Sequence, residues 1–287
     1  MGICFSTRNT SMFSQDPSLL PFLDRSVVKD ISIGFQKVCL EHLVKFIQSK
    51  SMSEFDCNNW VLLSRDLPSP PNQLTSTFEL KGDDIDRLKK LVSSRSTTSQ
   101  LDHPSRFELA CAYVWLCLVK SNSTTSDGDE VVSSISFAAD CRSRLDPPIP
   151  PTYFGNCVIF VQVNANREDI VGENGLLVAL DAIMKEVRGL GDGVIRNLEG
   201  RLLDMVSRGP HRFDAIVGST HFGAYKLDFG WGKPKKVEFT TVARTGAIFF
   251  ADSRNGDDDR DGVEISLARC KEEMDAFALS FLEGLKG

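Results

Sequence analysis

The sequence predicts an α/β fold in which helices pack on a mixed β-sheet, and three observations favour it. From residue 77 to the C-terminus, runs with helical spacing of apolar residues alternate with short strand-like runs. The later strand-like runs are often separated by short turns, at residues 244–245 and 255–260, so a strictly doubly wound sheet is not expected. With 287 residues, 41% of them hydrophobic and 25% charged, the chain can build a sizeable core.

The first regular elements follow residue 76. A short strand is predicted over residues 77–80, and Asp84 is expected to cap a helix that carries Ile85, Leu88, Leu91 and Val92 on one face. Ser105 and Glu108 have the spacing of a capping box, which predicts a helix from there through Lys120. This second helix is apolar on nearly every side, so it is expected to be buried.

The remaining elements alternate less regularly. Strands are predicted over residues 131–140, 156–163, 213–218, 236–243, 246–251 and 262–268. Helices are predicted over residues 175–187, 192–207 and 272–285. The last helix should bury the face formed by Met274, Phe277, Ala278, Phe281 and Leu282.

A proline-rich segment divides the chain. Residues 67–76 contain Pro68, Pro70 and Pro71, which rule out regular structure and predict a linker. We therefore expect an N-terminal part over residues 1–66 and a larger domain over residues 77–287. We leave open that some strand after residue 232 packs with the N-terminal part.

Composition excludes several classes of protein. A net charge of −6 argues against a general nucleic-acid binder, although a few local cations would suffice for an anionic small molecule. The eight cysteines form no C-x-x-C pair and have no histidine at ligand spacing, so we expect reduced thiols and no metal site. No apolar run reaches the ~18 residues of a membrane span and no signal peptide is evident, so a cytoplasmic protein without a membrane partner is expected.

The N-terminus fits a lipidation pattern. Met1, Gly2 and Ser6 match the myristoylation signal, and Cys4 offers a second acylation site. No clear polybasic or amphipathic anchor follows, so we do not expect lipidation. Metabolic labelling with a myristate analogue tests this, and no label at Gly2 is the expected result.

The strongest local feature is a run of five residues: Asp228, Phe229, Gly230, Trp231 and Gly232. Glycine permits positive φ or close backbone approach, and a carboxylate can accept backbone N–H groups or pair with arginine. From the residues alone, a rigid structural corner is favoured over direct catalysis.

A second feature combines one carboxylate with two arginines. If the strand over 131–140 continued, Asp140, Arg142 and Arg144 would point to the same face. One guanidinium would then be left for another partner, either an internal carboxylate such as Asp228 or the anionic end of a ligand. A structural salt bridge is somewhat favoured for either arginine alone.

A third feature is the run Tyr153, Phe154, Gly155 and Asn156 before a strand, where Asn156 offers both a donor and an acceptor. These three features, in this order, resemble the plant BAHD acyl-CoA-dependent acyltransferases. Residues 233–238, which follow the Asp228 run, also resemble the corresponding residues of this family. Residues 137–156, 111–115 and 24–30 are similar to the branch that malonylates phenolic and anthocyanin glucosides.

The resemblance implies a fold of two similar α/β layers, like chloramphenicol acetyltransferase, with a channel between them that takes acyl-CoA and acceptor from opposite sides. It implies that residues 1–66 are the remnant of the N-terminal acyltransferase domain, residues 67–76 the crossover, and residues 77–287 the C-terminal domain. No cofactor is expected. Acyl-CoA, with malonyl-CoA favoured, is expected as the co-substrate.

The resemblance also implies roles for individual residues. The Asp228 run would be structural, with Asp228 paired to Arg142 or Arg144, and either arginine would alternatively face an acyl carboxylate. Ser219 and Phe222 are expected on the acceptor side. CoA binding is assigned to Lys233, Lys235 or Lys236, although a solvated loop is favoured for this basic run.

The sequence departs from the family at its reactive motif. In relatives the histidine of His-x-x-x-Asp removes the acceptor proton, and it should lie ahead of Asp24. The residues four places after His42, His103, His211 and His221 are Phe46, Phe107, Ala215 and Tyr225, so none of the four histidines forms the motif. The spacing of His211 and Asp214 is one residue short, which we interpret as coincidence.

We therefore expect an incomplete first layer and no catalytic residue, in a chain that is weakly active or inactive. Loss of a general base alone lowers the rate by about 10²–10⁴. The favoured function is acyl transfer, from malonyl-CoA by preference, to a hydroxyl of a phenolic or flavonoid glucoside. The alternative is a non-catalytic remnant that associates with a partner protein through exposed apolar surface. The acyl-transfer hypothesis instead expects a monomer.

Overall fold

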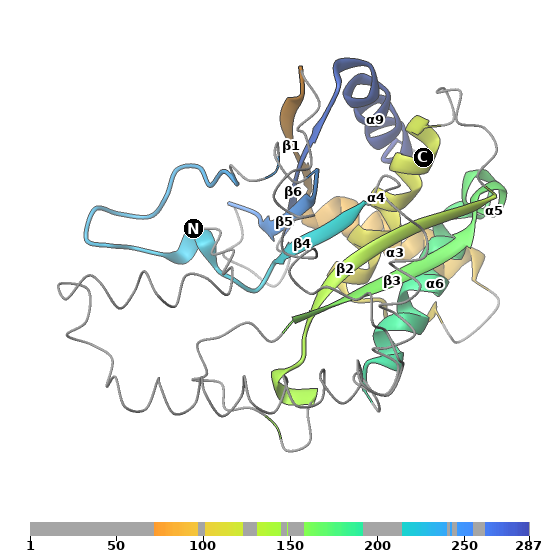
Figure 1. Ribbon diagram of the computed structural model, residues 1–287, viewed down its shortest axis with the longest axis horizontal. Helices are drawn as coiled ribbons and strands as arrows, with labels where there is room; N and C mark the ends of the chain where they lie inside the picture. The colour runs from red at the N-terminus through yellow and green to blue at the C-terminus, as the bar shows by residue number, and fades with distance from the viewer. Residues whose placement is uncertain are drawn as a thin grey trace, which may run out of the picture.

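The computed structural model describes residues 72–96, 101–122, 131–144, 148, 158–191, 214–239, 242, 246–254 and 262–286. These residues form a six-stranded mixed sheet with helices packed on it (Figure 1), which confirms the predicted mixed α/β class. The strands are β1 (Leu74–Leu80), β2 (Val132–Asp140), β3 (Val158–Asn166), β4 (Ala215–Ser219), β5 (Ile248–Asp252) and β6 (Val263–Arg269). The α-helices are α3 (Gly82–Arg95), α4 (Arg106–Asn122), α5 (Arg167–Val171), α6 (Gly175–Gly189) and α9 (Lys271–Gly284).

The strand order is β1-β6-β5-β4-β2-β3. The central strands β2, β4 and β5 run parallel, whereas β3, β6 and β1 join the sheet through antiparallel pairs. Parallel neighbours end at the same edge of a sheet, and loops at that edge are a common place for ligands in α/β proteins. The carboxyl ends of β2, β4 and β5 therefore define the edge at which a site is to be sought.

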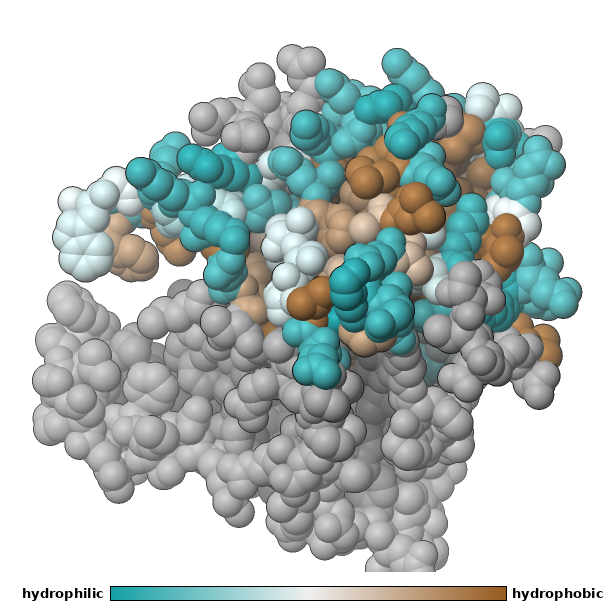
Figure 2. All heavy atoms as spheres, turned by 90° about the horizontal axis from the view of Figure 1, so that it is seen from above, coloured by the Kyte–Doolittle hydropathy of each residue, from teal (hydrophilic) through white to brown (hydrophobic). Residues whose placement is uncertain are grey.

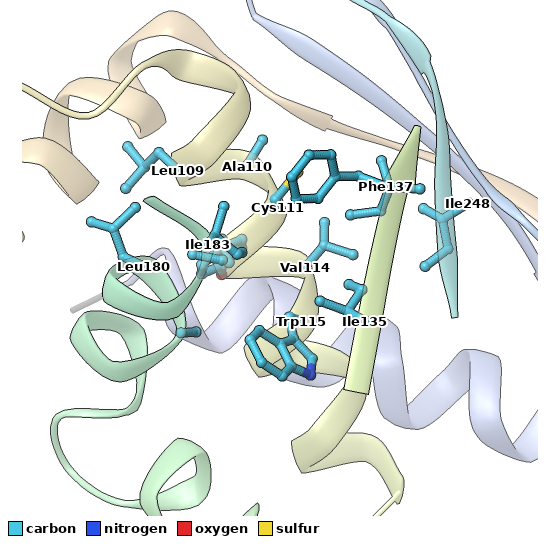
Figure 3. Packing of buried hydrophobic residues seen from close by; sticks show 14 of the residues in the cluster. Leu109, Ala110, Cys111, Val114, Trp115, Ile135, Phe137, Leu180, Ile183 and Ile248 are labelled. Carbon is cyan, nitrogen blue, oxygen red and sulfur yellow. The ribbon is translucent and has the colours of Figure 1, made fainter. Parts of the chain in front are cut away.

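Helix α4 is the centre of the core. Its capping box forms as predicted, because Ser105 N donates to Glu108 Oε2 at 2.7 Å and Glu108 N donates to Ser105 Oγ at 3.2 Å. Twelve of the 17 residues of the helix are buried. Figure 3 shows why: Leu109, Cys111 and Val114 of α4 lie between α6, with Leu180 and Ile183, and β2, with Ile135 and Phe137.

The two faces of the sheet differ in character. Alternate residues of each strand enter the helical core, including Phe137 of β2 and Ile265 of β6. The residues between them form the second face, which is rich in small and polar side chains. Among these, Ser134 Oγ donates to Asn164 Oδ1 at 2.7 Å, and the hydroxyls of Thr77 and Ser266 lie 3.0 Å apart.

Several predictions of local structure need correction. The N-cap of α3 is Lys81, and Asp84 instead lies inside the first turn, where its Oδ2 accepts from Lys81 N at 3.0 Å. The predicted strand over 236–243 is wrong in its described residues, because 236–239 are irregular and Val242 is helical. Leu282 of α9 points to solvent, since the helix buries a narrower face made by Met274, Phe277 and Phe281.

The predictions about the linker and the later elements can be compared with the structure only in part. Strand β1 begins at Leu74, inside the segment predicted as a linker, and the domain boundary itself stays a prediction. Strands β5 and β6, both beyond residue 232, pair with β4 and β1 in this sheet. The helix expected over 192–207 lies outside the described residues. Within the described part of the chain, every helix is too short or too polar to cross a membrane.

Candidate functional site

The site expected from the sequence lies at the edge where β2, β4 and β5 end. Asp140, Ser219 and Asp252 are the last residues of these three strands. The turn with Arg142 and Arg144 follows β2, and the loop that leads to Asp228 follows β4. Figure 1 shows the segment after β4 running outward from the sheet. The topology thus gathers on one edge residues that are 79 positions apart in the chain, from Asp140 to Ser219.

The Asp228 run forms a turn that is held by hydrogen bonds between its own residues. One carboxylate oxygen, Asp228 Oδ1, accepts from Gly230 N at 2.7 Å and from Gly232 N at 3.0 Å. Gly230 and Gly232 adopt φ of 94° and 91°, values that side chains disfavour, while no atom lies near a Cβ built at either position. The glycines are therefore required for backbone conformation rather than for space, as a structural corner predicts.

The two aromatic residues of the run face solvent. Trp231 is 93% exposed and Phe229 is 76% exposed. Phe222, at the start of the same loop, is also largely exposed. In Figure 2 the described chain extends outward from its main body in a projection that carries hydrophilic and hydrophobic residues. We call residues 227–236 the Asp228 arm.

The base of the Asp228 arm is held by a buried tyrosine. Tyr225 lies in the short 3-10 turn Ala224–Lys226 and its hydroxyl donates to the Glu264 carboxylate, 2.9 Å from Oε2 and 3.1 Å from Oε1. The same oxygen accepts from Val237 N at 3.2 Å. Beside it, Ala224 N donates to Asp252 Oδ1 at 3.1 Å.

These contacts form an acidic cluster at the base of the Asp228 arm. Burial raises the pKa of the Glu264 carboxyl, and the neighbouring carboxylates Glu79 and Asp252 raise it further, against the hydrogen bond from Tyr225. Burial is also the main cause that raises the pKa of Tyr225. The Ser253 hydroxyl donates to Glu79 in the same cluster. Sequence reasoning missed all of these residues, because they come from three strands and a turn that only the folded sheet brings together.

The two arginines are placed differently from expectation. The strand ends at Asp140, and residues Arg142–Arg144 form a single 3-10 turn, so the predicted shared strand face does not exist. Asp140 Oδ1 accepts from Arg142 N at 3.0 Å and from Arg142 Nη1 at 2.9 Å. Arg144 Nη1 donates to the Asp140 backbone oxygen.

Asp228 and the arginines thus have separate hydrogen-bond partners. None of the contacts between described residues joins Asp228 to Arg142 or Arg144, and Asp228 is satisfied by the arm's own amides. Asn156, the third member of the expected structural group, lies outside the described residues. The assignment of these residues to one structural motif stays a prediction.

The residues assigned to substrates lie along the same loop. Ser219 Oγ accepts from His221 N at 3.1 Å and so fixes the turn that presents Phe222. Lys233, Lys235 and Lys236 are exposed on the Asp228 arm, where Lys236 forms an ion pair with Glu238. An exposed run of this kind can meet an anionic ligand, but it equally serves as a solvated surface.

The coincidence suspected at Asp214 has a structural explanation. His211 lies outside the described residues, but Asp214 Oδ1 pairs with Arg269 Nη2 at 2.6 Å in a largely buried ion pair. Arg269 Nη1 also donates to the Gly246 backbone oxygen at 3.1 Å. Asp214 is therefore a structural residue that links the start of β4 to the end of β6.

Comparisons with known proteins agree with the fold. Vinorine synthase superposes with a TM-score of 0.60 at 22% identity, over 76% of this chain and 49% of that structure. TRI101 of F. graminearum, solved with coenzyme A and deoxynivalenol, gives a TM-score of 0.55 at 16% identity, over 73% of this chain and 48% of that structure. At these identities the likeness shows the fold alone.

Sequence relatives give the family. The chain is 34% identical to phenolic glucoside malonyltransferase 2 of Arabidopsis thaliana, over 95% of this chain and 58% of that protein. It is 31% identical to malonyl-coenzyme:anthocyanin 5-O-glucoside-6'''-O-malonyltransferase of Salvia splendens, over 91% of this chain and 52% of that protein. Residues 45–283 match the model of the Transferase family. The chain belongs to this family, that of the BAHD acyltransferases, and it spans somewhat more than half the length of these two relatives.

Proposed function

We propose that this chain serves acyl transfer from acyl-CoA, with malonyl-CoA preferred, to a hydroxyl of a phenolic or flavonoid glucoside. The observation that carries this is the match to a phenolic glucoside malonyltransferase along 95% of the chain, which includes both ends of the described sheet. The gathering of Ser219, Phe222, Arg142 and the Asp228 arm at one sheet edge supports it. This edge takes the substrates.

Arg142 and Arg144 provide the positive charge for a malonyl carboxylate. Each guanidinium carries a permanent positive charge and five N–H donors in a planar fork that suits a carboxylate. The 3-10 turn that carries both arginines directly follows β2, which fixes their place at the edge. Arg144→Ala should therefore weaken binding of malonyl-CoA more than binding of acetyl-CoA.

The Asp228 arm supplies the contacts to the CoA phosphates. Lys233 and Lys235 attract an anion through charges that salt screens, so CoA affinity should fall as ionic strength rises. Calorimetry with CoA tests this. The double variant Lys233→Ala/Lys235→Ala should bind CoA several-fold more weakly, whereas Lys90→Ala on α3 should bind as the unaltered chain does. Equal affinities in all three proteins would remove the arm from the CoA site.

The chain by itself should transfer acyl groups slowly. None of its 287 residues completes a His-x-x-x-Asp motif, and loss of a general base lowers rates by about 10²–10⁴. Incubation with malonyl-CoA and a phenolic glucoside, followed by mass spectrometry of the product, measures this. A rate near that of a full-length relative would contradict the expectation and would require another base.

A second candidate is a non-catalytic chain that associates with a partner protein, for example a full-length relative. The exposure of Trp231, Phe229 and Phe222 favours it, because large exposed apolar groups often mark contact surfaces. Size-exclusion chromatography with light scattering, alone and with a full-length relative, separates the two. A monomer that binds CoA supports acyl transfer, and a mixed complex supports the second candidate.

A further inference from the structure

The Asp228 arm leaves the sheet and returns to it close to one side chain. It departs after the 3-10 turn Ala224–Lys226 and returns at Val237, twelve residues beyond Tyr225. The Tyr225 hydroxyl meets both limbs: it lies on the outgoing limb and accepts from Val237 N on the returning limb at 3.2 Å. It also ties both limbs to the sheet through Glu264 of β6.

The Tyr225 hydroxyl can join both limbs and the sheet because it can donate one hydrogen bond and accept another. A tyrosine hydroxyl has one proton to donate and lone pairs that accept. Here the proton goes to the Glu264 carboxylate and a lone pair takes the Val237 amide, so the oxygen is used in both directions. Tyr225 is 7% exposed, and hydrogen bonds to charged acceptors shielded from water are stronger than neutral ones.

Each limb also has a contact of its own with the sheet, and neither of these two contacts joins one limb to the other. On the outgoing limb, Ala224 N donates to Asp252 Oδ1 at 3.1 Å. On the returning limb, the Phe239 ring stacks on Phe249 of β5 with centroids 3.8 Å apart and planes 17° from parallel. These contacts fix where each limb starts and ends, whereas the Tyr225 hydroxyl joins the limbs directly.

We infer that Tyr225 is a positioning residue whose hydroxyl holds the Asp228 arm closed, with Glu264 as its anchor on the sheet. The turn made by Asp228 shapes the tip, and Tyr225 sets how the tip is presented. This assignment stands on the contacts at the base of the arm and does not depend on the proposed acyl transfer.

Limited trypsin digestion tests the inference with the intact chain. Lys226, Lys235 and Lys236 lie at the two ends of the arm, and an open arm is cut faster than a closed one. Tyr225→Phe keeps the ring but removes the hydroxyl, so cleavage after Lys235 and Lys236 should become about tenfold faster or more, the loss expected for a hydrogen bond to a charged group. Mass spectrometry of the fragments identifies the sites.

Three further variants separate closure of the arm from general damage. Glu264→Ala removes the anchor and should speed arm cleavage as Tyr225→Phe does. Glu264→Gln keeps an acceptor for the phenol and should restore slow cleavage. Ser266→Ala removes a hydroxyl bond two residues along the same strand, between Thr77 and Ser266, and should leave arm cleavage unchanged.

The result that overturns the inference is arm cleavage in Tyr225→Phe at the rate of the unaltered chain. Equal acceleration by Glu264→Gln and Glu264→Ala would likewise overturn it, because the role of Glu264 would then not be that of an acceptor. Cleavage rates at lysines of α9, such as Lys271, report global unfolding in the same digests. Acceleration there that matches the arm in Tyr225→Phe also contradicts a local latch.

Discussion

At the scale of single residues, four carboxylates of the described part of the chain have two kinds of role: two bind their own loop and two hold elements together. Asp228 accepts two amides of its own turn and Asp140 binds the turn that follows it. Asp214 and Glu264 instead join segments far apart in the chain, to Arg269 and Tyr225. Loss of Asp214 or Glu264 should therefore lower the stability of the whole fold, whereas loss of Asp228 or Asp140 should affect mainly the local loop.

Asp214→Ala is expected to destabilise the fold by about 3 kcal/mol, the usual cost when one partner of a buried ion pair is removed. Arg269 is 5% exposed and would keep its charge without the carboxylate 2.6 Å away. Urea unfolding at neutral pH measures the loss. Asp275→Ala, which breaks the solvent-exposed pair with Lys271, is the matched control and should change the free energy of unfolding little.

Glu264 should make the stability depend on pH in an unusual direction. Burial raises the pKa of its carboxyl in the folded protein above the ordinary value of 4.5. As the pH rises above 4.5, the unfolded chain loses this proton first, so the folded state binds more protons and the contribution of this group to stability falls until the folded pKa is passed.

The groups that face Glu264 come from every element around it. They are Tyr225 and the Arg254 backbone N–H, which lower its pKa, and Glu79 and Asp252, which raise it. Glu264→Gln does not titrate, so its stability relative to the unaltered chain should rise as the pH increases above 4.5, the ordinary pKa of the carboxyl. Urea unfolding of both proteins at several pH values gives this difference. A difference that is constant with pH would show that the carboxyl titrates normally.

At the scale of elements, α4 shows how a buried helix is fixed at its start and near its middle by different means. Its start is closed by the Ser105 and Glu108 capping box, which is visible in the sequence. Farther along, Tyr113 reaches across to α9, where its hydroxyl donates to the Phe281 backbone oxygen at 2.5 Å. The second contact joins residues 168 positions apart and depends on how the two helices meet, and the sequence carries no sign of it.

Gly284 is where α9 makes room for Tyr113. A Cβ built at Gly284 would lie 2.5 Å from the Tyr113 hydroxyl oxygen, too close for two atoms not bonded to one another. Gly284→Ala should therefore cost about 1–3 kcal/mol, the range for overpacking. Thermal or urea unfolding measures it, in a background of Tyr113→Phe as well.

In the Tyr113→Phe background the clashing atom is absent, so Gly284→Ala should cost less there. The remaining ring atoms lie 3.0 Å and 3.1 Å from the built Cβ, so relief should be partial. Costs that simply add in the double variant would mean that the two positions do not touch.

At the scale of the whole molecule, one continuous core joins the described strands and helices. Residues of β1, β2, β5 and β6 share a buried cluster with α3, α4, α6 and α9. Such a core should unfold as one unit. Phe137, which lies between β2 and α4 in Figure 3, is close to its centre.

Phe137→Ala should lower the free energy of unfolding by about 3–5 kcal/mol through loss of buried area and the cavity left behind. Far-ultraviolet circular dichroism and the near-ultraviolet signal of the tryptophans, which include buried Trp115, should follow one urea transition moved to lower urea. Two separated transitions would contradict a single core.

The fold class and much of the element order could be predicted because periodicity and capping are local. Residues 105–108 start α4 as expected, and the apolar pattern of that helix correctly indicated that it lies in the core. The failures are at ends and loops. Arg142 and Arg144 were placed on a strand by extending its alternation, but the chain turns directly after Asp140.

For the candidate site, the sequence by itself determined the residue types and the family: the Asp228 run with its two positive-φ glycines, and the lack of a His-x-x-x-Asp motif in these 287 residues. The tertiary structure decided which residues meet. Strand order brings the ends of β2, β4 and β5 to one edge, and it places Glu264 of β6 beneath Tyr225. Local patterns follow from the chain's own spacing, whereas contacts between strands depend on a topology that no local pattern contains.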